Sequence, residues 1–207
     1  MGSRYDIAIL RNTSIRHVMQ ACAGRVQIGE RVAHPGGGEQ SRTIAEITTG
    51  FGTHVVIVGQ PASHFPGIDS SLADVLGIEM IRATVWDTLS LYSLSLFGNN
   101  VNRYLSYDPE EALAEGVPAQ VHAEGPRLDE EPEWEFDEAY IQEVCQRRTG
   151  IDPSYLQGHD AAWRSLLEPR QPVQAPSDTV APVPARVDAA PNPQRGWVRI
   201  KSWFNRQ

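Results

Sequence analysis

The residues best suited to chemistry are the six histidines, and their positions single out one loop. His54 stands beside a run of four apolar β-branched residues, and His64 and Asp69 follow in the turn-rich stretch after it. Loops at the ends of strands often carry functional residues. A site around His54, His64 and Asp69 would use a titrating histidine or a bound metal ion. The alternative is that His54 is a hydrogen-bonded histidine at the margin of the core.

Other catalytic signatures are absent from the sequence. No histidine is spaced with another histidine or a cysteine as metal ligands on a helix or hairpin would be. The glycines at 36–38 are followed by Glu39 and Gln40 rather than by the lysine of a P-loop, which favours a surface loop. Cys22 and Cys145 fall on the apolar faces of expected helices, which indicates buried free thiols. We therefore assign no catalytic residue, no metal ligand and no cofactor.

Acidic residues are concentrated in one segment, residues 108–143. This segment holds thirteen of the 26 acidic residues and a single arginine, Arg127. Like charges at this density repel one another, so something must offset them. The segment is either a solvated loop anchored by Trp134 and Phe136, or an acidic surface that binds a basic partner. The candidate partner-binding residues are Glu130, Glu131, Glu133, Trp134 and Glu135.

The last forty residues have a different composition. Seven prolines lie between positions 169 and 193, which predicts an extended, disordered linker over residues 169–195. Residues 196–207 are basic and aromatic, and could bind an acidic membrane surface, enter a groove of a partner, or fold back on the acidic segment. Chance composition is the alternative. The candidate binding residues of this peptide are Trp197, Arg199, Lys201, Trp203 and Phe204.

The elements that must position these residues are predicted from hydrophobic periodicity. Strands are expected at residues 5–10, 43–48, 54–58, 78–86, 89–97 and 101–107, and Gly98, Asn99 and Asn100 predict a tight hairpin between the last two. Helices are expected near residues 15–22, 71–77, 137–149 and 160–167. The sequence therefore predicts one α+β domain over residues 1–168, with a mostly antiparallel sheet of about six strands and helices on one face.

Composition limits the class of protein further. The chain has 207 residues, a formal net charge of −8 and a pI near 5.2, which argues against nucleic-acid binding. No apolar run approaches the roughly 18 residues of a membrane helix. Residues 1–6 lack an apolar signal core, so we expect a cytoplasmic protein.

Five short motifs accompany the expected elements: Leu76-Gly77, Val85-Trp86-Asp87, Gly98 with Arg103-Tyr104, Gly125-Pro126-Arg127-Leu128 and Arg148-Thr149-Gly150-Ile151. With these motifs, the order of expected elements resembles bacterial domains of the actinobacterial type, some of them found near polymorphic-toxin or contact-dependent systems. The resemblance covers roughly residues 4–156 and excludes the proline-rich tail. It implies a small intracellular protein that binds another protein, and it brings no catalytic residues.

Three functions are compatible with these observations. The first is a non-enzymatic, immunity-like protein that binds a basic protein partner through its acidic surface. The second is an adaptor that docks on a scaffold or a membrane surface through residues 196–207. The third is an enzyme with a site near His64. The oligomeric state stays open.

Overall fold

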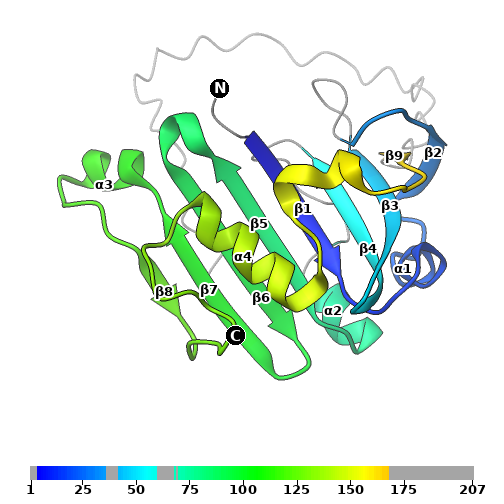
Figure 1. Cartoon of the computed structure of the whole chain (residues 1–207), viewed down its shortest axis with the longest axis horizontal. Helices are drawn as coiled ribbons and strands as arrows, with labels where there is room; N and C mark the ends of the chain where they lie inside the picture. Colours follow the sequence, from blue (N-terminus) through cyan, green and yellow to red (C-terminus); the bar gives the residue numbers. More distant parts are fainter. Residues whose placement is uncertain (1–3, 36–41, 60–67, 69, 168–207) are drawn as a thin grey trace, which may run out of the picture. The chain divides into compact units, whose positions relative to one another are not determined.

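The computed structural model describes residues 4–35, 42–59, 68 and 70–167. They form an α+β domain around a nine-stranded antiparallel sheet (Figure 1). The strands are β1 (Arg4–Leu10), β2 (Gln27–Arg31), β3 (Arg42–Thr49), β4 (Gly52–Gly59), β5 (Met80–Trp86), β6 (Leu91–Gly98), β7 (Val101–Tyr107), β8 (His122–Glu124) and β9 (Arg164–Leu167). The helices are α1 (Ile15–Ala21), α2 (Ser70–Leu76), α3 (Pro109–Glu115) and α4 (Glu138–Thr149), with short 3₁₀ turns η1 (Asp87–Leu89) and η2 (Pro153–Gly158).

The first strand of the chain lies at the centre of the sheet. The order is β2-β9-β3-β4-β1-β5-β6-β7-β8, so β1 pairs with β4 on one side and β5 on the other. The strands expected at residues 78–86, 89–97 and 101–107 are confirmed as β5, β6 and β7, which pair in sequence as a meander. The expected hairpin is also confirmed, because Asn99 and Asn100 both have positive φ in the turn from β6 to β7.

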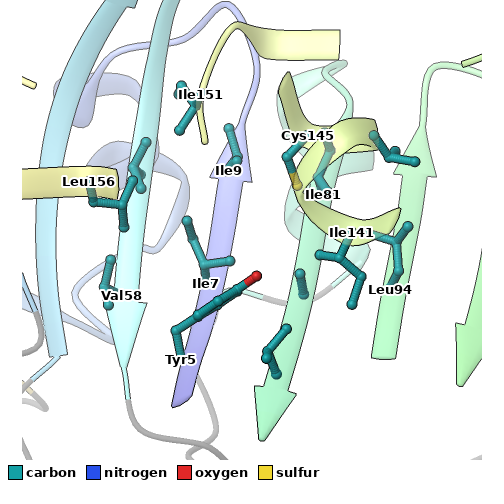
Figure 2. Close-up of a cluster of buried hydrophobic side chains, with 14 of the residues drawn as sticks. Tyr5, Ile7, Ile9, Val58, Ile81, Leu94, Ile141, Cys145, Ile151 and Leu156 are labelled. Carbon is teal, nitrogen blue, oxygen red and sulfur yellow. The ribbon is translucent and has the colours of Figure 1, made fainter. Parts of the chain in front are cut away.

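The sheet is covered on both faces, which corrects the expectation of helices on one face. Residues of β1 alternate: Ile7 and Ile9 join a core beneath α4, whereas Ala8 and Leu10 join a second core beneath α1 and α2. Figure 2 shows Ile141 and Cys145 of α4 over strand residues of the first core. A continuous apolar run in a strand, as in β4, is what two covered faces require.

Helix α4 begins and ends where the sequence predicts. The Asp137 side chain accepts a hydrogen bond from the Tyr140 backbone N–H at 2.8 Å, which caps the first turn. Gly150 ends the helix with a φ of 73°, a conformation that favours glycine. The last turn of α4 contains Arg147 and Arg148, whose positive charges interact favourably with the negative end of the helix dipole.

Three further predictions are wrong in detail. The helix expected near residues 160–167 does not form: residues 164–167 are strand β9, which pairs with β2 on one side and β3 on the other. Strand β2 lies at residues 27–31, where no element was expected, and the acidic segment contains α3 and β8 before the expected helix. These strands raise the total from about six to nine. They were missed because pairing with distant strands, rather than local pattern, stabilises them.

Candidate functional site: an acidic surface beside α4

Glu131 is one of the candidate partner-binding acids, and the structure buries it. Only 5% of the residue is exposed. Arg103 donates from Nε to Oε1 at 2.7 Å and from Nη2 to Oε2 at 2.8 Å. The Tyr140 hydroxyl and the Leu128 backbone N–H donate to the same carboxylate at 2.6 and 3.0 Å. Burial alone would raise the pKa of Glu131, but these hydrogen bonds outweigh it and hold the pKa below its ordinary value.

Glu130, the neighbouring candidate, belongs to a second ion-pair network. Its Oε2 accepts a hydrogen bond from Arg148 Nη1 at 2.7 Å. Arg148 Nε and Nη2 also donate to the two oxygens of buried Glu79, which Arg11 contacts at 3.1 Å. This network fastens the last turn of α4 to the residue before β5. Glu130 and Glu131 therefore have intramolecular partners.

The remaining three candidates lie in the solvent. Glu133, Trp134 and Glu135 are all exposed, in the stretch that follows buried Pro132 and leads into α4. Trp134 is half exposed, which is unusual for so large an apolar side chain. Buried Phe136 fixes this stretch to the core, where its ring meets Tyr140 edge-on at a centroid distance of 5.3 Å.

An open cleft of about 470 Å³ begins next to these residues. It lies between the turn from β5 to β6, the first turn of α4, and η2. None of the described residues that line it is a lysine or an arginine. Its polar lining is Asp87, Tyr92, Asp137, Glu138, Gln142 and Ser154. We call Asp87, Glu133, Trp134, Glu135, Asp137 and Glu138 together the α4 acidic surface.

Tyr92 lines this cleft beside its carboxylates. Its hydroxyl donates to Asp87 Oδ1 at 3.0 Å. Burial raises the pKa of Tyr92 to about 12, together with that hydrogen bond and the negative charges of Asp87, Asp137 and Glu138. Burial disfavours charge of either sign, so the negative character of the cleft rests on its carboxylates rather than on this pKa. Asp87, Asp137 and Glu138 give the cleft a negative potential, because no lysine or arginine is among the described lining residues.

His54 is fully buried and hydrogen-bonded. Its Nδ1 lies 3.4 Å from the Asn12 backbone nitrogen and its Nε2 lies 3.3 Å from Thr49 Oγ1. Burial lowers the pKa of His54, and the positive charge of Arg11 lowers it further. His54 is thus a neutral core histidine whose ring nitrogens both have neighbours. His64 and Asp69, the other members of the hypothetical catalytic loop, lie outside the described residues.

The tail residues Trp197, Arg199, Lys201, Trp203 and Phe204 also lie outside the described residues. Within the described ranges, no group of three or more histidine, cysteine, aspartate or glutamate side chains is placed to hold a metal ion. No helix in that same part of the chain is long and apolar enough to cross a membrane. Cys22 and Cys145 are buried and not joined in a disulfide, as expected.

Sequence reasoning missed the arginines that neutralise Glu130 and Glu131. Arg103 lies two positions before Leu105 on β7, so both side chains point to the same, core-facing side of the sheet. A charge at such a position needs a partner. That signal identifies Arg103 as paired but not its partner, 28 residues away. Asp6 was missed in the same way, although it sits between apolar neighbours of β1.

The geometry defines an α+β domain on a single antiparallel sheet, with an acidic surface beside its longest helix. No protein-family model matches the chain, and no curated protein or solved structure matches it significantly.

Proposed function

We propose that this protein is a non-enzymatic binding domain that holds a basic protein partner on the α4 acidic surface. One observation carries the proposal: Glu130 and Glu131 are neutralised by arginines of the fold, whereas the acids around the cleft lie beside no lysine or arginine of its lining. An immunity-like role, in which the partner is a basic toxin domain, is one form of this proposal.

The surface combines charge with an apolar anchor. Carboxylates on one face speed the encounter with a basic partner and make binding weaken with salt. Exposed Trp134 adds the large, rigid contact area that is enriched at the energetic centres of interfaces. Charge would therefore steer the partner, and Trp134 would supply much of the affinity.

Capture experiments with the full-length chain test this proposal. Tagged wild-type protein is used to capture partners from a lysate of its source cells, beside the variant Asp87→Asn/Glu133→Gln/Glu135→Gln. A matched control, Glu30→Gln/Asp74→Asn/Asp160→Asn, loses the same number of exposed charges elsewhere. We expect a basic partner that wild type and control recover, that the α4 variant loses, and whose yield falls between 50 and 300 mM salt.

Three outcomes would contradict the proposal. The first is equal recovery by all three proteins. The second is loss of the partner on Trp203→Ala/Phe204→Ala with no effect of the α4 variant, which would transfer the binding function to residues 196–207. Recovery of no partner by the wild-type chain would also count against it.

A further inference from the structure

Helix α3 has capping residues at both ends, and none of its own residues is buried. Asp108 caps it, accepting hydrogen bonds at Oδ1 from the backbone N–H groups of Glu110 and Glu111 at 3.0 Å. Pro109 occupies the first position, and Gly116 closes the helix with a φ of 71°. Isolated helices this short are marginal in water, so such complete capping suggests a helix that packs against something else.

Apolar side chains gather beside this helix. Among the described residues, eight large hydrophobic side chains are exposed, and Leu113, Val117 and Val121 are three of them within nine positions. Leu113 is 82% exposed. Figure 1 shows α3 at the end of the sheet beside β8, reached from the end of β7. We call residues 108–124 the α3 arm. Clustered exposed apolar residues rimmed by charges are typical of an interaction site.

A hollow of about 580 Å³ is formed by the arm itself together with Ser106 of β7. It has room for a large side chain of another protein. Its lining is part apolar and part acidic, and includes Asp108, Glu111, Ala112, Val117, Pro118 and His122.

The negative charge of the arm indicates which kind of partner could bind there. Residues 108–126 contain five acidic residues and neither lysine nor arginine. A second copy meeting the arm with its own arm would bring five carboxylates against five, and an anionic membrane would be repelled in the same way. A cationic protein segment with apolar side chains satisfies both the hollow and the charge.

We propose that the α3 arm is a docking surface for a basic amphipathic segment of another protein. In this arrangement an apolar side chain of the partner segment contacts Leu113 and Val117, and the lysines or arginines of the segment face Asp108 and Glu111. The inference goes beyond the proposed function, since the arm shares no residue with the α4 acidic surface and either surface can work without the other.

A defined probe tests the arm directly in the full-length protein. The probe is a 14-residue helical peptide of leucine and lysine, beside one with every leucine changed to alanine and one with every lysine changed to glutamate. Affinity is measured by fluorescence anisotropy, and the contact is located by amide hydrogen exchange. We expect binding by the leucine-lysine peptide alone, with exchange slowed over residues 109–122.

Three variants make the test specific. Leu113→Ser/Val117→Ser and Glu110→Gln/Glu111→Gln should each weaken the probe at least tenfold. Glu30→Gln/Asp74→Asn, which removes two exposed charges outside both surfaces, should leave its affinity unchanged. Slowed exchange over residues 109–122 rather than over 133–138 separates this inference from the proposed function. Circular dichroism should show the same melting temperature for all variants, because the arm buries nothing.

Other results would overturn the inference. Protection that falls outside residues 108–124, or equal affinity for the alanine peptide, would exclude an apolar docking site on the arm. Concentration-dependent self-association that Leu113→Ser/Val117→Ser abolishes would make a second copy the occupant and remove the basic partner.

Discussion

Two buried carboxylates lie on opposite faces of the sheet and have opposite properties. Glu131, beneath α4, receives hydrogen bonds from Arg103, Tyr140 and Leu128. Asp6 lies on the other face, is 3% exposed, and its Oδ1 has no hydrogen-bond partner among the described residues. Burial raises the pKa of Asp6 to about 7, although the charges of Arg82 and Arg42 oppose the rise. Equal burial therefore stabilises the charged form in one case and the neutral form in the other.

A count of acidic residues could not locate the proposed binding surface, because these carboxylates differ only in their surroundings. An acid can be a structural ion-pair partner, a destabilised buried group or a solvated charge, and the three differ only in what surrounds them. Glu131, Asp6 and Glu133 represent these three environments in one domain. We therefore expect substitutions of these three residues to change the free energy of unfolding, and its dependence on pH, in different ways.

The largest expected effect is the loss of the charge of Glu131. Glu131→Gln leaves the guanidinium of Arg103 buried without a counter-charge, and we expect the free energy of unfolding to fall by about 3–5 kcal/mol at pH 7. Because the pKa of Glu131 is lowered in the folded protein, wild type loses this advantage as the pH falls below about 4.5. Urea denaturation measures both effects.

A double variant is the control for that experiment. Arg103→Met/Glu131→Gln removes both charges and should recover most of the lost stability. A loss below 1 kcal/mol in Glu131→Gln alone would show that this pair is open to water in solution.

Asp6→Asn is expected to stabilise the protein. The folded pKa of about 7, against an ordinary 3.8, means that above pH 7 wild type folds with a buried charge that costs up to about 4 kcal/mol. The stability of wild type should rise as the pH falls from 7 to 4, because the folded state takes up a proton. The gain in Asp6→Asn should therefore be largest at pH 8 and vanish near pH 4, as measured by urea denaturation. Destabilisation at pH 8 would mean that Asp6 has a strong cationic partner.

His54 should have the opposite dependence on pH. Its pKa is lowered in the folded protein, so the stability that depends on its neutral form is present above pH 6.5 and is lost as the pH falls further. The slope is at most about 1.4 kcal/mol per pH unit. In an Asp6→Asn background, which removes the competing titration, His54→Gln should flatten the curve between pH 6.5 and 5. An unchanged slope would assign the acid sensitivity to another group.

The smallest expected effect is on the exposed acids. Glu133→Gln/Glu135→Gln should change the free energy of unfolding by less than about 0.5 kcal/mol, because neither side chain is buried. Thermal denaturation at low salt checks this. A loss of 2 kcal/mol or more would place these acids with Glu131, as parts of the fold rather than of a binding surface.

Much of the fold follows from local sequence. Asp137 and Gly150 mark the ends of α4, and the Gly98-Asn99-Asn100 turn identifies the β6–β7 hairpin. What could not be predicted depends on distant partners. Residues 164–167 are a strand only because β2 and β3 flank them, although more than 110 residues separate them from either.

The candidate site was predicted only as a region. Composition identifies residues 108–143, and it cannot tell Glu131 from Glu133, two positions apart, because the difference is made by Arg103 on β7. The spacing of the acidic residues likewise does not predict the η1 turn, which places Asp87 at the cleft.

The position of β9 between β2 and β3 has a consequence for synthesis on the ribosome. Strands β3, β4, β1 and β5 to β8 can pair once residue 124 has emerged, because all their partners are then available. Strand β2 pairs only with β9 among the described strands, so it must wait until residues 164–167 follow, some 135 residues after its own appearance. During that interval one edge of the nascent sheet, β3, is open to other chains, and a chaperone or rapid completion of translation would be needed to protect it.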